Sequence, residues 1–257
     1  ERQSCVVLHG RGHRETLGLN ALLIAEWRPK CNCLRWRVQY DPQVLEDLGG
    51  WTNRDTTDYF TDYARVVFDK LADRVNLWST FCEPWVSAFL GYGTGLHAPG
   101  ICDYSKAYPT AHHLLLAHGK TVQAYREGGY SGQIGMALNL NGLIPASESE
   151  EDKAATQRVH NETHALFLDP LFKGKYPETL FNYIGAHQPK IQEGDLQIIR
   201  QPIDFLGVNY YNTDYVKFDL FGGLNKARLI PFSAPGWGRT EMNWGIDPDG
   251  IRREVLY

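Results

Sequence analysis

Apolar and polar residues follow a helical period and then a strand pattern along this chain. Apolar side chains between Tyr59 and Leu71 recur at helical spacing after an Asp55/Thr56 cap signal, which predicts a helix with one buried face. The run 75–81 that follows is short, β-branched and aromatic, which predicts a buried strand. This is one helix-then-strand step.

The same alternation recurs further along the chain. We expect helices or helical pieces over 110–126, 150–167, 177–187 and 192–199, and strands over 133–140 and 204–211. The first of these helices should stop at Gly128, and the second should end before the dipeptide Asp169-Pro170.

Helices that alternate with parallel strands indicate an α/β fold, and long loops after the strands favour a barrel over an open sheet. An eight-stranded barrel needs about 250 residues even without insertions. Only three strands stand out in this sequence. We therefore expect a partial (β/α)8 TIM barrel.

Composition and charge exclude several classes of partner. The 257 residues carry a net charge of -4 and are 43% hydrophobic, which is typical of a globular protein with one sizeable core. No basic cluster suits nucleic acid, and no run of about 18 apolar residues suits a membrane span. We expect neither partner.

The five cysteines are odd in number and show no paired spacing, which argues against a disulfide framework. We therefore expect a reducing compartment, with the cytoplasm as the default, and the first residues show no secretory signal. No cofactor and no metal is expected.

Glu83 is the main candidate for chemistry. It follows the strand 75–81 and precedes Pro84, which disfavours a helical backbone at Glu83 and predicts an extended one. In a barrel the carboxyl ends of the strands carry the active site. A fixed carboxylate near Trp78 and Trp85 is thus a candidate general acid, and a structural glutamate at a strand end is the plainer alternative.

The segment 79–100, STFCEPWVSAFLGYGTGLHAPG, resembles the segment around the acid/base glutamate of the retaining β-glucosidases of glycoside hydrolase family one. The resemblance implies that Glu83 is the acid/base. The family has Thr-Phe-Asn-Glu-Pro where this chain has Cys82, and the family's asparagine is a donor to the sugar 2-hydroxyl. Cys82 thus falls at a substrate-binding position, although a thiol is a poor donor. A small cysteine that only fills volume is the alternative.

The strand 204–211 is similar to the family segment in which an asparagine and a second tyrosine face the active site. This implies that Asn209 and Tyr211 bind substrate, and that the Tyr211 hydroxyl would orient the nucleophile. Without the resemblance, alternating aromatic residues at a strand end are part of a core about as often as they line a site.

The resemblance divides the chain in two. Residues 1–39 show no family resemblance and stay unassigned, whereas 40–257 resemble the middle of the family's barrel, without its first and last strands. The segment 244–251 resembles the one that precedes the nucleophile strand, and Tyr257 is reached before that strand.

Two functions therefore stay open. One is a retaining, β-glucosidase-like hydrolase that acts on a small β-glucoside or oligosaccharide. The other is a catalytically inactive truncated barrel that at most binds sugar or a partner chain. An incomplete barrel also predicts self-association through its exposed edges.

Three further patterns favour plainer interpretations. His160 and His164 are spaced for one face of a helix, but Glu162 is misplaced for a zinc-protease motif. The loop 91–95 is rich in glycine but lacks the lysine of a phosphate loop. The pair in 31–33 is too closely spaced for a redox motif.

Overall fold

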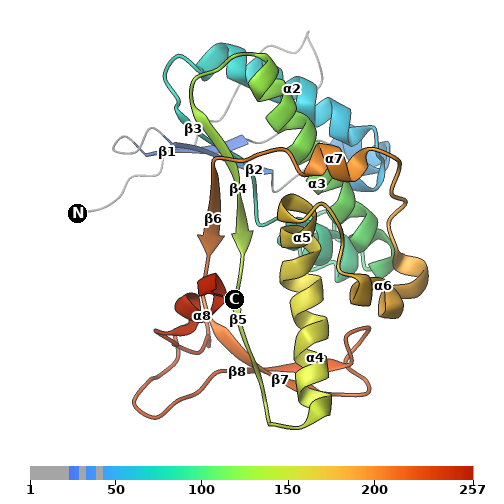
Figure 1. The fold of residues 1–257 in the computed structure, drawn as a ribbon, viewed down its shortest axis with the longest axis vertical. Helices are drawn as coiled ribbons and strands as arrows, with labels where there is room; N and C mark the ends of the chain where they lie inside the picture. The colour runs from blue at the N-terminus through green and yellow to red at the C-terminus, as the bar shows by residue number, and fades with distance from the viewer. Residues whose placement is uncertain (1–22, 29–32, 39–42, 257) are drawn as a thin grey trace. The chain divides into compact units, whose positions relative to one another are not determined.

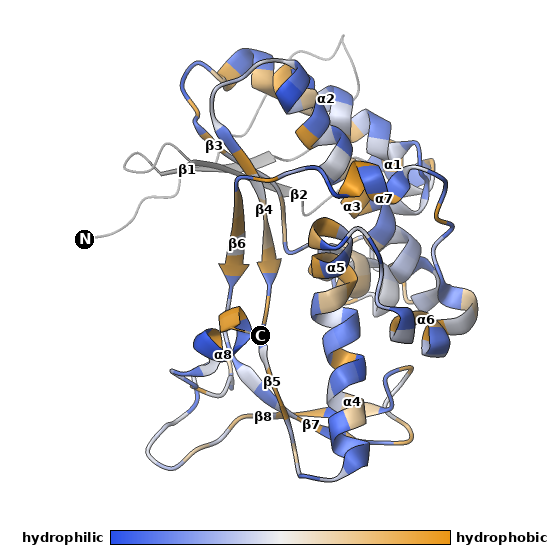
Figure 2. Ribbon diagram, viewed as in Figure 1, coloured by the Kyte–Doolittle hydropathy of each residue, from blue (hydrophilic) through white to orange (hydrophobic). Residues whose placement is uncertain are grey.

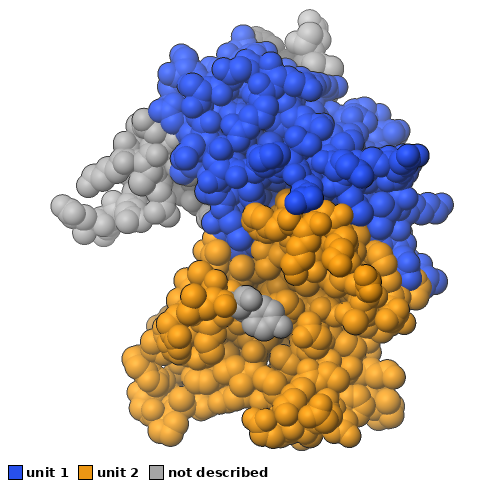
Figure 3. Space-filling view, viewed as in Figure 1, with its two compact units in different colours: residues 1–138, 186–207 blue, residues 139–185, 208–257 orange. Residues whose placement is uncertain are grey.

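The computed structural model describes residues 23–28, 33–38 and 43–256. The chain forms two compact units, which Figure 3 shows in different colours. Unit 1 comprises residues 1–138 and 186–207, and unit 2 comprises 139–185 and 208–257. Residue 31 of the cysteine pair lies outside the described residues, as does much of the unassigned segment 1–39, within which two strands are described.

A five-stranded sheet has the order β1-β2-β3-β4-β6 and begins in unit 1. Its strands are β1 (Leu23–Arg28), β2 (Cys33–Val38), β3 (Leu77–Cys82), β4 (Gln133–Asn139) and β6 (Phe205–Asn209). Strand β1 is antiparallel to β2, whereas β2, β3 and β4 run parallel. Figure 1 shows β4 and β6 running in the same direction. The sheet does not close into a barrel within the described residues.

Helix α2 (Thr56–Leu71) covers this sheet because its apolar residues share one face. Phe60, Ala64 and Phe68 are four residues apart and are all buried. Figure 2 shows the resulting mixture of hydrophobic and hydrophilic positions along α2, and it shows β4 and β6 as mainly hydrophobic strands.

Helix α3 (Tyr104–Glu127) is buried along most of its length. It packs against α2, against the π-helix η2 (Val86–Gly93) and against α7 (Asp195–Ile199). It starts before the expected Thr110 because the Asp103 side chain accepts a hydrogen bond from Ser105 N and caps the helix.

Aromatic rings fill the space between β3 and these helices. Trp78 meets Phe68 edge to face at 5.0 Å between ring centroids, and Phe81 stacks on Phe60 at 4.6 Å. This packing fixes β3, which ends at the candidate site, against α2.

Unit 2 contains a smaller sheet of order β5-β7-β8. The strands are β5 (Gly142–Pro145), β7 (Thr213–Phe218) and β8 (Ala227–Pro231). Strand β5 is parallel to β7, and β8 is antiparallel to β7. Helix α4 (Glu150–His160) packs on this sheet through Ala155 and Val159 against Val216.

The expected end of the helix 150–167 before Asp169-Pro170 is wrong. The π-helix η3 (Asn161–Ala165) and helix α5 (Leu166–Phe172) continue from α4, with Pro170 inside α5. Pro170 is buried together with Leu166, Phe167 and Leu171, so tertiary burial offsets the hydrogen bond that the proline cannot make. The sequence interpretation also missed all three strands of the smaller sheet.

The remaining elements are short. They are α1 (Gln43–Asp47), η1 (Gly50–Thr52), α6 (Glu178–Ile184), η4 (Gly185–His187) and α8 (Gly250–Leu256). Across the described residues, none of the helices has the length and apolar character needed to cross a membrane.

Candidate active site

Strand β3 contains a β-bulge just before the candidate acid. Ser79 pairs with Gly135 on β4, but the next pair is Cys82 with Ala137. Thr80 and Phe81 on β3 therefore face Met136 alone, so that β3 has one extra residue at this point.

The bulge changes which face each side chain takes. Trp78 contacts Phe68 on α2, Thr80 contacts His118 on α3, and Phe81 also contacts α2 through Phe60. Strict alternation would put Phe81 on the opposite face from Thr80. The extra residue lets Phe81 join the core, and alternation from Phe81 would put Cys82 on the opposite face of the strand.

Glu83 follows the last residue of β3, as the sequence indicates, but its extended backbone was a wrong prediction. Its φ is 57°, in the left-handed region that residues other than glycine rarely adopt. Its N–H donates to Ala137 O at 2.8 Å, and its carbonyl accepts from Val86 N at 2.9 Å. The chain turns from strand to helix within this residue, since Pro84 already begins the next helix. Glu83 is only 7% exposed.

The two tryptophans around this turn differ. Trp78 is a core residue, whose Nε1 donates to Val75 O at 3.1 Å. Trp85 is half-buried, follows Glu83 by two residues and stacks on Phe89 with ring centroids 5.5 Å apart. Its Nε1 is buried and has no hydrogen-bond partner among the described residues. That a tryptophan lies beside the Glu83 carboxylate stays a prediction.

Cys82 is half-buried and belongs to unit 1 together with Glu83. Asn209 and Tyr211 belong to unit 2. Asn209 ends β6 and accepts a hydrogen bond from Leu140 N at 3.0 Å through its backbone carbonyl. The four predicted site residues thus come from two strand ends, β3 and β6.

Tyr211 is 49% exposed, and its ring lies 5.4 Å from that of Trp244, which is 37% exposed. Trp244 was not among the predicted site residues. It lies in the segment 244–251 that the sequence had already marked, but only the structure puts it beside Tyr211. The pair offers an apolar surface of the kind that can hold a sugar ring.

The histidine pair of the zinc interpretation lies in unit 2. The rings of His160 and His164 are 5.0 Å apart, and His164 Nδ1 lies 3.6 Å from Glu254 Oε2. Burial lowers the pKa of His164 to about 3, and Glu162 accepts a hydrogen bond from Asn225. The described part of the chain contains no group of three side chains that could hold a metal ion.

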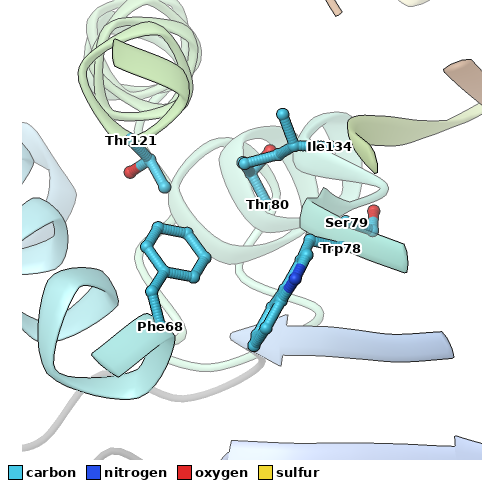
Figure 4. A pocket seen from close by; sticks show the side chains of 6 residues that line it. All are labelled: Phe68, Trp78, Ser79, Thr80, Thr121 and Ile134. Carbon is cyan, nitrogen blue, oxygen red and sulfur yellow. The ribbon is translucent and has the colours of Figure 1, made fainter. Parts of the chain in front are cut away.

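A hollow beside β3 lies within the core and is not a substrate site. It is lined by Phe68, Trp78, Ser79, Thr80, Thr121 and Ile134, shown in Figure 4, and has no room for a water molecule. It does, however, bring the hydroxyls of Thr80 and Thr121 into one small region.

Comparison with known proteins gives a consistent result. The family model of glycosyl hydrolase family 1 matches residues 21–257. The chain is 41% identical over 239 residues to beta-glucosidase A of Acetivibrio thermocellus, covering 90% of this chain and 51% of that protein. It is 38% identical over 234 residues to 1,4-beta-D-glucan glucohydrolase of Thermotoga neapolitana, covering 91% and 53%.

Among solved structures, a family 1 β-glucosidase from Thermotoga maritima matches with a TM-score of 0.79 at 38% identity. That match covers 86% of this chain and 49% of the other. The chain therefore spans about half the length of the relatives that it matches. The resemblance inferred from the motif and the partial TIM-barrel fold class are both confirmed, but the family match begins at residue 21, whereas the resemblance was seen only from residue 40.

Proposed function

The chain belongs to glycosyl hydrolase family 1, and on that premise we propose that it acts as a retaining, β-glucosidase-like hydrolase on the O-glycosidic bonds of β-glucosides. The observation that carries the proposal is Glu83, a buried carboxylate at the carboxyl end of the parallel strand β3 within the motif Thr-Phe-Cys-Glu-Pro. The similarity to named β-glucosidases supports it and does not favour the alternative of an inactive barrel.

Glu83 is proposed to act twice. It first donates a proton to the glycosidic oxygen as the aglycone leaves, and then, as a carboxylate, takes a proton from the water that releases the sugar. A retaining reaction also needs a second carboxylate about 5 Å away as the nucleophile. Glu83 would supply the acid and the base of this reaction and not the nucleophile.

Cys82, Asn209 and Tyr211 are the proposed substrate-binding residues. Cys82 would lie near the sugar 2-hydroxyl, Asn209 would supply amide hydrogen bonds, and Tyr211 with Trp244 would present their rings to a sugar face. The proposal that the substrate is a small β-glucoside or oligosaccharide rests on the similarity to the named glucosidases.

Two subsidiary proposals concern the setting of the protein. The odd number of cysteines supports a reducing compartment such as the cytoplasm.

Exposed apolar residues on β8, Leu229 and Ile230, support self-association through a sheet edge. Gel filtration over a range of protein concentrations tests the second, and a size that stays monomeric throughout would contradict it.

Glu83→Gln tests the main proposal with two aryl β-glucosides, one with a good leaving group and one with a poor leaving group. On the glucoside with the poor leaving group, we expect the rate of hydrolysis to fall by about 100-fold or more. On the glucoside with the good leaving group, the first step, in which the enzyme is glycosylated, needs little acid assistance, so its rate should fall much less. Glu193→Gln, the same change at an exposed site, is the control and should affect neither.

Equal losses of Glu83→Gln on both substrates would show that Glu83 is not the acid. Inactivity of the unaltered chain on the activated glucoside would reject hydrolysis and leave the inactive barrel.

A further inference from the structure

Thr80, which precedes Glu83 by three residues, forms a buried hydrogen bond with His118. Thr80 Oγ1 and His118 Nδ1 are 2.6 Å apart, and Thr80 Oγ1 also lies 3.3 Å from Gly135 O. His118 is fully buried on α3, and Thr80 is 2% exposed. The bond thus connects α3, β3 and β4 within unit 1.

Counting donors assigns the direction of these bonds. Burial lowers the pKa of His118 to about 3, so the ring is neutral and carries one N–H. If Nδ1 carries it, His118 donates to Thr80 and the Thr80 hydroxyl donates to Gly135 O. Only the Nε2 lone pair, which has no partner among the described residues, is then left over. The other tautomer would bury an N–H group without a partner, which is rarer in proteins.

These bonds fall on the β-bulge itself. Thr80 is one of the two residues that face Met136 alone, and Gly135 is the last partner before the register shifts. Ser79 Oγ donates to Phe81 O at 3.0 Å, so the carbonyl of the second bulge residue is also held. The bulge decides on which face the chain reaches Cys82 and Glu83.

We propose that His118 is a positioning residue, which through Thr80 fixes the bulge in β3 and thereby the direction of Cys82 and Glu83. In its catalytic consequence this inference rests on the proposed acid/base role of Glu83. In its structural part it stands independently, because the hydrogen bonds and the register shift lie in one unit and involve no substrate.

The structural part is tested by the reactivity of Cys82. Alkylation by iodoacetamide, followed by peptide mass spectrometry, gives the rate at Cys82 relative to the exposed Cys102 in the same molecule. Thr80→Val keeps the shape and removes the hydroxyl, so that segment 80–83 should open more often and Cys82 should react about tenfold faster or more. Thr80→Ser should restore the rate of the unaltered chain.

Thr121→Val is the matched control. It removes a buried hydroxyl from α3 in the same hollow (Figure 4), and that hydroxyl has no partner among the described residues. It should leave the ratio of Cys82 to Cys102 alkylation unchanged. Equal effects of Thr80→Val and Thr121→Val, or no effect of Thr80→Val, would overturn the proposal.

His118→Phe tests the other end of the bond. It keeps a ring and removes the donor, so it should raise Cys82 reactivity as Thr80→Val does. If both act on one bond, the double variant should be no more reactive than the stronger single variant. Additive effects would mean that the two residues act separately, against the proposal.

The catalytic consequence is tested with the same two aryl β-glucosides. Thr80→Val should lose about tenfold more activity on the poor leaving group than on the good one, because a misdirected acid matters only where acid assistance is needed. Thr80→Ser should recover it. If Glu83→Gln shows this selectivity and Thr80→Val does not, the positioning role fails. If Glu83→Gln lacks it, the proposed function fails while the alkylation result still decides the structural part.

Discussion

The guanidinium of Arg54 forms a bidentate pair with the carboxylate of Asp195, with Nη1 2.9 Å from Oδ2 and Nη2 2.5 Å from Oδ1. His112 Nε2 lies 3.0 Å from the same Oδ2, and Gln192 N donates to it at 2.8 Å. Burial opposes ionisation of Asp195, but the hydrogen bonds from Arg54, Gln192 and His112 outweigh it and lower the pKa of Asp195 to about 2. This cluster links the start of α2, the middle of α3 and α7.

Asp195→Asn should destabilise the protein markedly. The amide keeps the shape but removes the charge that Arg54 and His112 share, in a site where Asp195 is 1% exposed. We expect the free energy of unfolding in urea to fall by about 2–3 kcal/mol. Asp58→Asn is the control, because Asp58 is exposed and pairs with Lys120 at the surface. It should cost less than about 1 kcal/mol, and similar losses in both variants would contradict the buried role.

Stability should fall as the pH is lowered below about 6.5. Burial lowers the pKa of His112 to about 4 and the pKa values of His118 and His164 to about 3. Their ordinary value is near 6.5, so between about pH 6.5 and 4 the unfolded chain takes up protons that the folded chain does not. The stability that these residues contribute is therefore present above pH 6.5 and is lost as the pH falls.

The urea midpoint measured at pH 7.5, 6.0 and 5.0 checks this dependence. We expect the midpoint to decrease over this range. Each histidine should lower the free energy of unfolding by at most about 1.4 kcal/mol per pH unit. His112→Gln should make the decrease shallower. The contribution of Asp195 lies lower still, since its carboxylate is protonated in the unfolded chain only as the pH falls through about 3.8. A midpoint that does not change between pH 7.5 and 5.0 would refute the expectation.

Gly119→Ala should weaken the packing of α3 on α7. A Cβ at Gly119 would lie 2.1 Å from Ile198 O, a backbone atom that cannot move away without moving α7. We expect a loss of about 1–3 kcal/mol, seen as a lower midpoint of thermal unfolding. At Gly238 a Cβ would meet no atom within 4 Å, so Gly238→Ala should stay within about 0.5 kcal/mol. An unchanged midpoint for Gly119→Ala would argue against this close approach.

Cys82→Asn should improve hydrolysis if Cys82 lies at the sugar 2-hydroxyl. An amide is a better hydrogen-bond donor than a thiol, and contacts to this hydroxyl strengthen in the transition state of such reactions. We expect kcat/KM on an aryl β-glucoside to rise by about tenfold or more. The 2-deoxy-β-glucoside should show no gain, and Cys82→Ala should improve neither substrate. An equal gain on both sugars would count against the proposed contact.

The spacing of apolar residues within single segments was enough to predict several helices and strands. Helix α2 and strands β3, β4 and β6 were expected close to where they lie, because their apolar residues recur with one clear period. The same reasoning placed Glu83 at the end of a strand. It failed at Pro170, where burial of the neighbouring side chains overrides a local helix breaker.

Other details of the candidate site could be seen only in the three-dimensional structure. The φ of Glu83 and the β-bulge depend on how β3 pairs with β4, and Trp244 meets Tyr211 only through the path of the chain between them. The bond from Thr80 to His118 joins residues 38 positions apart, and the pair of Arg54 and Asp195 spans 141 positions.

The sequence by itself thus determined helix α2, the strands β3, β4 and β6 and which carboxylate follows β3, because burial on one face leaves a period that a single segment displays. Only the tertiary structure decided the register of β3 against β4, the turn at Glu83 and the partners of the buried polar groups. Those features are set by contacts between segments far apart in the chain, and no period within one segment records them.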